Sequence, residues 1–311
     1  AALAAVVWLA DWPRVLAVLR QSRPGWIALG LVFAVASNVV SALRWRALVR
    51  WLGGALPVRQ ALRWYFQAMS LNVLLPGAVV GGDVWRAWVL RRAGQPVAAA
   101  SWSVLLDRLS GLWMLCALGA VGAAASAGVL GAWLRVPPFW LATLALLGTA
   151  LWLALPWALP WLLRGVVRRA GGDGVGASLH APGWGGTLAA AAHRRGFGRQ
   201  LAGQSLASLL VQALSAAALA ASGYGLGVRL DAAAWAFAVA PVFLMAALPV
   251  SVGGWGTREA AAVAALAPFG VPAAAAVGCG LMYGMYGVVQ AIGGALAFGF
   301  PGAPSATKAA P

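Results

Sequence analysis

Two short segments of this chain place a proline, a pair of glycines and an arginine inside apolar sequence. They are LLPGAVVGGDVWR at residues 74–86 and ALPVSVGGWGTRE at residues 247–259. Proline interrupts a helix because it has no backbone N–H, and glycine lets one backbone approach another closely. The residues concerned are Pro76, Gly81, Gly82 and Arg86 in the first segment and Pro249, Gly253, Gly254 and Arg258 in the second. Both segments therefore predict a broken helix that carries a cation.

A helix broken within a membrane offers an anion-binding site. The N–H groups at the start of its second half lack partners and carry the positive end of the helix dipole. Arg86 and Arg258 each lie four residues beyond the second glycine, so a phosphate could contact N–H donors and a guanidinium together. The alternative is that the glycines only allow tight packing and each arginine reaches the headgroup region. Because two matched segments occur, we favour the binding interpretation.

Acidic residues are rare, and several of them adjoin these arginines. Six residues of the chain are acidic. The candidate acid–arginine pairs are Asp83 with Arg86, Asp107 with Arg108, and Glu259 with Arg258. An ionisable residue inside an apolar span is a functional candidate by default, although these acids could instead only neutralise buried arginines. Asn72 is a further candidate, because its amide could satisfy carbonyls freed by the break or could join two helices.

The composition places the chain in a lipid bilayer. Of its 311 residues, 62% are hydrophobic and 9% are charged, which is too apolar for a soluble core. The net charge of +16 comes from arginines at the ends of apolar runs, as the positive-inside rule predicts, so we expect no nucleic-acid partner. Cys116 and Cys279 are predicted core residues. His180 and His193 both lie in the polar central segment, so we expect no metal site and no cofactor.

The apolar runs predict an all-α, polytopic membrane protein with a single integral membrane domain over residues 1–311. Residues 1–10 are predicted to be the remnant of a first helix, and residues 11–23 a helix at the interface. Predicted crossings are residues 24–43, 98–130, 138–163, 201–223 and 272–298. The arginine-rich and glycine-rich segment at about 164–199 is predicted to be a cytoplasmic loop. Residues 301–311 form a short tail.

The two broken helices are predicted to be re-entrant hairpins that enter from opposite faces. The first repeat covers about residues 56–130 and the second about residues 230–298. Arg91 and Arg92 indicate that the first hairpin begins and ends at the cytoplasm. Three crossings follow, so residues 224–231 lie outside and the second hairpin enters from there. The two repeats therefore have inverted topology, and the C-terminus is cytoplasmic.

In their order along the chain, these motifs resemble a known family. The motifs are Arg44-Trp45, Asn72-x-x-x-Pro76-x-x-x-x-Gly81-Gly82-Asp83-x-x-Arg86, Asp107-Arg108, and Leu248-Pro249-x-Ser251-x-Gly253-Gly254-x-Gly256-x-Arg258-Glu259. They look like the lysylphosphatidylglycerol synthase transmembrane-region family. That family includes the flippase domain of the multiple peptide resistance factor and stand-alone proteins, one of them associated with hopanoid biosynthesis.

The resemblance implies two inverted repeats, re-entrant hairpins and movement of a lipid between leaflets of the bacterial inner membrane. It also adds Arg44 to the candidate site. Two departures limit what can be transferred. Asp107 stands where the family usually has glutamate, and the sequence contains no aminoacyl-transferring soluble domain, so synthase activity is not implied.

We therefore expect a flippase, not an enzyme, that binds a lipid with a polar or anionic headgroup. The cargo is left open between a phospholipid, an aminoacyl-phospholipid, a polyprenyl-phosphate and a hopanoid. One alternative is a membrane enzyme such as a lipid transferase, but the acids mostly adjoin arginine and are poor bases. The other is a scaffold that moves no lipid. A second copy of the chain and lipid-biosynthesis enzymes are the candidate protein partners.

Overall fold

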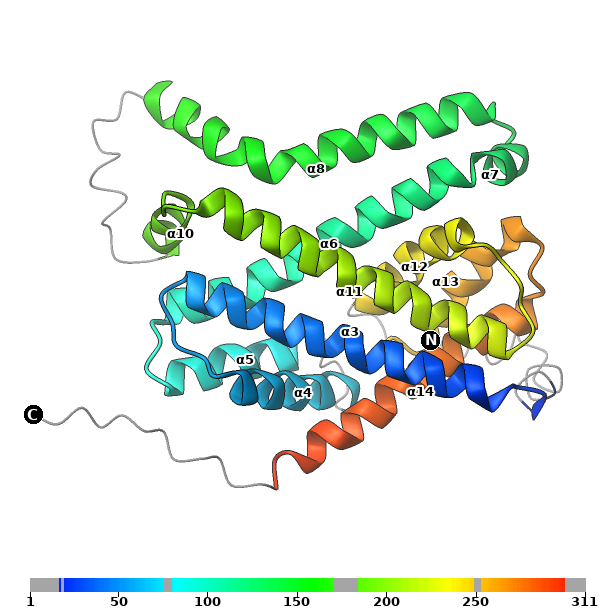
Figure 1. Cartoon of the computed structure of the whole chain (residues 1–311), viewed down its shortest axis with the longest axis horizontal. Helices are drawn as coiled ribbons and strands as arrows, with labels where there is room; N and C mark the ends of the chain where they lie inside the picture. The colour runs from blue at the N-terminus through cyan, green and yellow to red at the C-terminus, as the bar shows by residue number, and fades with distance from the viewer. Residues whose placement is uncertain (1–16, 18–19, 75–79, 170–183, 249–252, 300–311) are drawn as a thin grey trace, which may run out of the picture.

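The protein is a bundle of helices, most of them aligned roughly along one axis (Figure 1). The computed structural model describes residues 17, 20–74, 80–169, 184–248 and 253–299, and over these ranges it contains helices and no strand. Five of the helices in this part of the chain are long and apolar enough to cross a membrane. They are α3 (Pro24–Trp51), α6 (Val97–Ala125), α8 (Pro138–Arg169), α11 (Phe197–Gly225) and α14 (Ala273–Leu296). The predicted all-α membrane fold is confirmed to this extent.

Two pairs of shorter helices lie where the sequence predicts broken hairpins. The first pair is α4 (Val58–Leu74) and α5 (Gly81–Arg92), and the second is α12 (Ala232–Ala247) and α13 (Thr257–Leu266). The longest, α4, has 17 residues and extends about 26 Å, less than the roughly 30 Å of a hydrocarbon core. The two members of each pair pack on each other. Pro76 and Pro249 lie outside the described residues.

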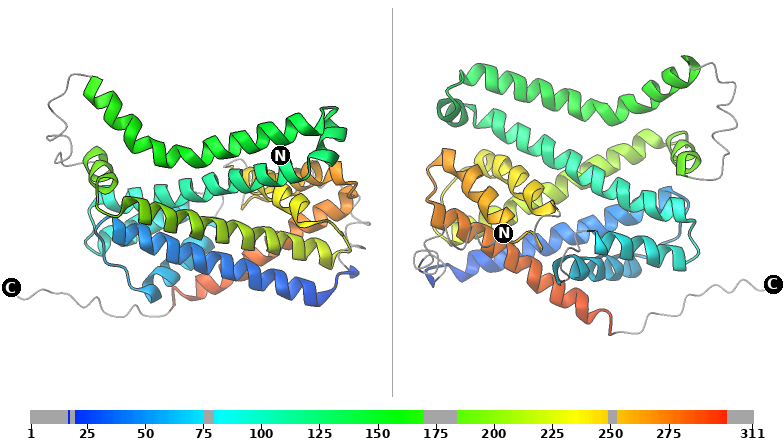
Figure 2. Two further views of the ribbon diagram at one scale, coloured as in Figure 1. Left: turned by 45° about the horizontal axis from the view of Figure 1, so that its top comes forward. Right: turned by 180° about the vertical axis from the view of Figure 1, so that it is seen from behind.

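These two pairs occupy opposite ends of the bundle. In Figure 1, α4 and α5 lie toward the left end and α12 and α13 toward the right end, and the view from behind in Figure 2 agrees. Helices α3, α6 and α11 pass between the two ends. Helix α8 follows the outer edge and packs mainly on α6. The long helices thus form a frame that holds one short pair near each end.

The connection that follows each short pair has the same backbone geometry. After α5 the chain passes through Gly94 with φ of 89°, and Pro96 then precedes α6 with ψ of 140°. After α13 and the one-turn helix η1 (Ala267–Phe269), Gly270 has φ of 72° and Pro272 precedes α14 with ψ of 140°. A positive φ costs glycine little, and proline suits a helix start. The sequence repeat is therefore also a repeat of local structure.

The interior of the bundle is built from small side chains. Helix α11 packs along α3, and α12 packs along α6. Gly122 of α6 lies so close to α12 that an added Cβ would be 2.3 Å from the backbone nitrogen of Phe237. The largest buried hydrophobic cluster consists mostly of alanines, among them Ala238, Ala240 and Ala262. Small residues allow this approach because packing, and not water exclusion, joins helices in lipid.

The structure changes the bounds of several predicted elements. The crossing predicted at residues 98–130 ends at Ala125 and is followed by the separate helix α7 (Ala127–Leu134). The predicted loop at 164–199 is partly helical, because α8 continues to Arg169 and α10 occupies Trp184–Ala192. Most of residues 1–23, and residues 301–311, fall outside the described part of the chain.

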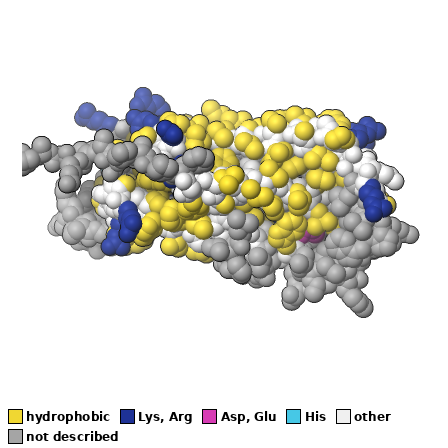
Figure 3. Space-filling view, turned by 90° about the horizontal axis from the view of Figure 1, so that it is seen from below, with side chains coloured by type: hydrophobic (Ala, Val, Ile, Leu, Met, Phe, Trp, Pro, Cys, Tyr) yellow, Lys and Arg dark blue, Asp and Glu magenta, His cyan; other side chains and the backbone are white. Residues whose placement is uncertain are grey.

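The surface has the polarity expected of a membrane protein. On the face drawn in Figure 3, hydrophobic side chains cover the middle of the bundle, while arginine side chains lie toward its two ends. Helix α8 is the clearest case, because only 6% of its apolar window Pro138–Ala158 is buried by protein. An apolar band flanked by basic ends matches a bilayer core between two headgroup layers.

Candidate functional site

A chain of ion pairs lies in the interior of the bundle and starts at Arg44 of α3. The guanidinium of Arg44 donates from Nε to Oδ1 of Asp107 at 3.0 Å and from Nη1 to the hydroxyl of Ser208 at 3.0 Å. Its Nη2 donates to the backbone oxygen of Asp107, also at 3.0 Å. Arg44 thereby joins α3 to α6 and α11. The sequence alone places Arg44 in a basic helix end, whereas the structure buries it.

Arg86 of α5 continues the chain of ion pairs from the other side of Asp107. Its Nη1 lies 2.7 Å from Oδ2 of Asp107, and its Nη2 lies 2.7 Å from Oδ1 of Asp83. The guanidinium carbon also lies 5.2 Å from the ring centroids of Trp45 and Tyr65. Two carboxylates and two aromatic faces therefore hold this cation, which suits its burial.

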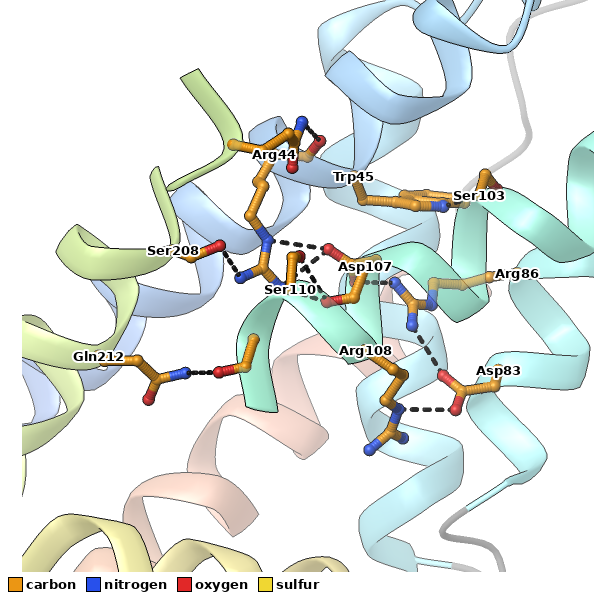
Figure 4. A network of polar contacts seen from close by, with 12 residues as sticks. Arg44, Trp45, Asp83, Arg86, Ser103, Asp107, Arg108, Ser110, Ser208 and Gln212 are labelled. Carbon is orange, nitrogen blue, oxygen red and sulfur yellow. Dashed lines mark hydrogen bonds and ion pairs between the residues drawn. The ribbon is translucent and has the colours of Figure 1, made fainter. Parts of the chain in front are cut away.

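Arg108 completes the network at its most exposed end. Its Nε donates to Oδ2 of Asp83 at 2.7 Å. Exposure of the side chains rises along the network, from 5% for Arg44 and Arg86 to 19% for Asp83 and 35% for Arg108. Figure 4 shows the alternation of guanidinium and carboxylate groups from Arg44 to Arg108. The network thus leads from the buried core to an accessible edge.

The five charged residues line a cavity of about 310 Å³. The rest of its described lining combines uncharged polar groups with aromatic and apolar ones. The polar members are Ser37, Asn38, Ser41, Asn72, Gln212 and Ser215, and the aromatic members are Tyr65, Phe243 and Tyr283. Elements far apart in sequence contribute to it, from α3 to α14. A concave site with convergent polar groups inside an apolar bundle is the form that ligand sites take.

The predicted backbone donors at Gly82 are used within the protein. The N–H of Gly82 donates to Oδ1 of Asn72 at 2.7 Å, so it is closed to a ligand in this state. An added Cβ at Gly82 would lie 2.2 Å from the backbone oxygen of Ala68. The glycine therefore permits α4 and α5 to touch, and Asn72 satisfies the freed N–H. The contacts around Gly82 therefore agree with the alternative interpretation, in which the glycine allows tight packing of helices.

Arg258 and Glu259 of the second segment form a separate, buried ion pair. Arg258 Nη2 lies 3.0 Å from Oε1 of Glu259, and the Glu259 side chain is fully buried. Oε2 of Glu259 accepts from the N–H of Gly256 at 2.5 Å. The Arg258 guanidinium also lies 4.7 Å from the Trp255 ring centroid. Neither Arg258 nor Glu259 is among the described residues that line the cavity.

The glycines of the second segment bring it against the first. Gly253 and Gly254 have φ of 57° and 78°, which other residues rarely adopt. An added Cβ at Gly253 would lie 3.3 Å from the backbone oxygen of Val73 in α4. The two broken elements are therefore neighbours, as expected for a joint site. Only the first contributes charges to the cavity in this conformation.

Sequence reasoning named the charged residues but missed most of the neutral lining. Asp83, Arg86, Asp107 and Arg108 come together as expected, whereas Arg258 and Glu259 lie apart from them. Two of the missed residues had a detectable signal, because polar residues recur on one face of apolar α11 at helical spacing. The recurring residues are Gln204, Ser208, Gln212 and Ser215, and the last two of them line the cavity. Such a stripe within an apolar span indicates a polar neighbour.

The chemistry of the site is that of charge recognition. Every oxygen of the Asp83 and Asp107 carboxylates contacts a guanidinium. Across the described residues, no group of three or more His, Cys, Asp or Glu side chains is placed to hold a metal ion. What the site presents is an array of guanidiniums, hydroxyls and amides.

The family comparison agrees with the motifs. The model of the lysylphosphatidylglycerol synthase transmembrane region matches residues 1–294, nearly the whole chain. The chain belongs to this family, as its motifs predicted. A comparison with curated proteins finds no match.

Proposed function

We propose that this member of the lysylphosphatidylglycerol synthase transmembrane-region family moves a lipid with a polar or anionic headgroup between leaflets. One observation supports this most, namely the cavity of about 310 Å³ whose lining holds three arginines and two aspartates inside a bundle of membrane-length helices. Buried charges are costly in a membrane and are kept where they act on a substrate. The bacterial inner membrane is the proposed location.

The proposed architecture has two inverted repeats with one re-entrant hairpin each. Helices α4 with α5, and α12 with α13, are the hairpins in this proposal. Three observations support it: the short lengths of these helices, their places at opposite ends of the bundle, and the matched glycine and proline geometry after each pair. Paired broken helices of this kind mark the substrate site in many transporters. The C-terminus is proposed to be cytoplasmic.

In the proposed mechanism the headgroup enters the cavity while the acyl chains stay in lipid. A headgroup loses hydration when it leaves the membrane surface, and this is costly unless it finds new polar partners. Arg108 and Asp83, the most exposed members of the network, are the first charges it contacts. Movement down a concentration gradient needs no further energy source. The cavity lowers the barrier by replacing water along the route.

Two other functions, a lipid-modifying enzyme and a scaffold, use the observed site less fully. An enzyme of this kind needs a general base or a metal ligand, and both aspartates of the cavity are held by guanidiniums through all their oxygens. A scaffold needs no cavity lined by charge. The transport function therefore uses the observed site most fully.

Replacement of Arg86 by glutamine tests the proposal. Arg86→Gln removes the cation between the two carboxylates, and we expect lipid translocation in reconstituted liposomes to fall by at least about tenfold, the factor that corresponds to 1.4 kcal/mol. The variant is expected to remain monodisperse, because Asp107 still forms an ion pair with Arg44 and Asp83 still forms one with Arg108. Translocation is measured with lipids labelled on an acyl chain and a quencher that stays outside.

Arg91→Gln is the matched control. Arg91 lies in the last turn of the same helix and is exposed, so this variant loses the same charge away from the cavity. It is expected to translocate at the wild-type rate. Equal rates for wild type, Arg86→Gln and Arg91→Gln would reject a headgroup site at Arg86, and an absence of translocation by the wild-type protein with every lipid class would reject transport.

A further inference from the structure

Every carboxylate oxygen of the cavity already contacts a guanidinium. Oδ1 of Asp107 lies 2.9 Å from Arg44 Nη2, and its Oδ2 lies 2.7 Å from Arg86 Nη1. Both oxygens of Asp83 are likewise 2.7 Å from guanidinium nitrogens, one from Arg86 and one from Arg108. An ammonium group that entered the cavity would have to share either acid with the guanidiniums already bound to it. It would then lie beside those positive charges, and like charges repel strongly in a low-dielectric interior.

The lining also carries an excess of positive charge. Three arginines and two aspartates line the cavity, so the described lining has a net charge of 3 − 2 = +1. Its other described members are uncharged. In a low-dielectric interior a net charge of this size attracts an anion and repels a cation over several ångströms. The charge of the cavity therefore matches a ligand with a single negative charge.

Among the three arginines of the cavity, a ligand can reach Arg108 most easily, because it lies at the exposed edge of the network. Arg44 and Arg86 are almost fully buried, whereas the Arg108 side chain is 35% exposed. A phosphate that enters from the accessible edge therefore contacts Arg108 first. Arginine suits this role because its planar fork binds phosphate oxygens in pairs.

A second group of lining residues is polar but uncharged. Ser37, Asn38 and Ser41 come from α3, and Gln212 and Ser215 come from α11. In Figure 4, Gln212 lies at the end of the drawn network away from Asp83. Hydroxyl and amide groups can both donate and accept hydrogen bonds. Some already bond within the protein, as Ser37 does with Ser215 at 2.9 Å and Gln212 does with the backbone oxygen of Gly111 at 3.0 Å. Because each group can make more than one such bond, they also offer partners to ligand hydroxyls, which would otherwise lose their hydration without compensation.

Building on the proposed function, we propose that the cavity takes a phosphodiester lipid whose headgroup is uncharged and hydroxylated, and that it rejects lipids whose headgroup carries ammonium groups. The phosphate is bound at the arginine edge and the hydroxyls by the serine and amide groups of α3 and α11. Phosphatidylglycerol is the simplest lipid of this class. Lysyl-phosphatidylglycerol has the same phosphate and adds two ammonium groups, so it is the discriminating probe.

The experiment compares four acyl-labelled lipids in liposomes that contain the full chain. They are phosphatidylglycerol, phosphatidylmethanol, lysyl-phosphatidylglycerol and phosphatidylethanolamine. We expect phosphatidylglycerol to move at least about tenfold faster than lysyl-phosphatidylglycerol, because the two headgroups differ by two units of charge and each unit changes the interaction by this order or more in a partly buried site. Phosphatidylmethanol has the phosphodiester without hydroxyls and is expected to move at an intermediate rate. Equal or faster movement of lysyl-phosphatidylglycerol would overturn the proposal while transport stands.

Two variants separate the two recognition groups. Arg108→Gln brings the net charge of the lining to zero and is expected to remove most of the preference for phosphatidylglycerol over phosphatidylethanolamine. Ser41→Ala removes one hydroxyl from the neutral group and is expected to slow phosphatidylglycerol but not phosphatidylmethanol. Arg91→Gln, outside the cavity, should leave all four rates unchanged. If Arg108→Gln and Ser41→Ala leave the order and ratios of the rates as in the wild type, this assignment of the cavity is wrong.

A soluble glycerol phosphate offers the same kinds of group as the headgroup, a phosphate and hydroxyls, and a further arm distinguishes the two. Radiolabelled glycerol 3-phosphate should accumulate no faster in protein-containing liposomes than in empty ones. Faster accumulation would mean that the cavity carries a soluble phosphate, which would overturn the lipid assignment. If none of the four lipids moves and glycerol 3-phosphate does not either, it is the proposed transport function that fails.

Discussion

The two buried clusters of charge differ in how many partners each acid has. Asp107 contacts two guanidiniums, those of Arg44 and Arg86. Asp83 also contacts two guanidiniums, those of Arg86 and Arg108. Glu259 contacts one guanidinium and one backbone N–H, and its side chain is fully buried. Loss of one arginine therefore leaves each aspartate paired but leaves Glu259 almost alone. The first cluster can change partners when a ligand enters, whereas the second has no substitute and is suited to hold its element in place.

This difference predicts different effects when Arg86 and Arg258, which occupy equivalent positions in the sequence repeat, are replaced. Arg258→Gln should destabilise the protein by about 3–5 kcal/mol, because it leaves a buried carboxylate uncompensated. Arg86→Gln should cost less stability but should lose translocation. Thermal unfolding in detergent measures the first effect, and translocation per folded molecule measures the second. An Arg258→Gln protein that is as stable as wild type but inactive would instead place Arg258 in direct contact with lipid.

Among the helices, α14 carries a contact that small residues alone allow. Its Gly294 faces α4, where an added Cβ would lie 2.1 Å from the backbone oxygen of Phe66. The adjacent Gly293 is exposed and has nothing within 4 Å of such a Cβ. A backbone oxygen within a helix cannot move aside as the end of a flexible side chain can. This contact therefore fixes the distance between α14 and the first short helix pair.

The two neighbouring glycines give a matched pair of alanine variants. Gly294→Ala must move α14 away from α4, and we expect it to cost about 1–3 kcal/mol, as overpacking usually does. Gly293→Ala adds the same methyl group to open space and should be neutral or stabilise by up to about 1 kcal/mol, since alanine favours a helix. Midpoints of thermal unfolding in detergent would show the difference. Equal midpoints would mean that α14 and α4 are not held at this distance.

At the scale of the whole molecule, the sequence predicted the repeated broken helices and the apolar spans. It did not predict which charged side chains pair with one another. The crossings and the two breaks follow from the length of apolar runs and from proline and glycine, which act locally. The pairing of Arg44 with Asp107 joins residues 63 positions apart, and no local rule indicates it. For the same reason Arg86 and Arg258 look alike in sequence, whereas their surroundings differ. The polar stripe of α11 is visible in the sequence, but only the packed bundle shows which residues of α3 and α11 line the cavity.

The proposed inverted topology leads to one prediction about the molecule as a whole. The helix pairs α4–α5 and α12–α13 lie at opposite ends of the bundle, so residues at their outer connections should face opposite sides of the membrane. Cysteines that replace Arg91 at the end of α5 and Arg229 before α12 test this, because both positions are exposed. They are introduced after Cys116 and Cys279 have been changed to alanine. A membrane-impermeant maleimide added to intact cells should label position 229 alone, and position 91 should label only after the membrane is opened. Labelling of both positions from the same side would exclude oppositely directed hairpins, and would leave the cavity as the product of two elements that enter from one face.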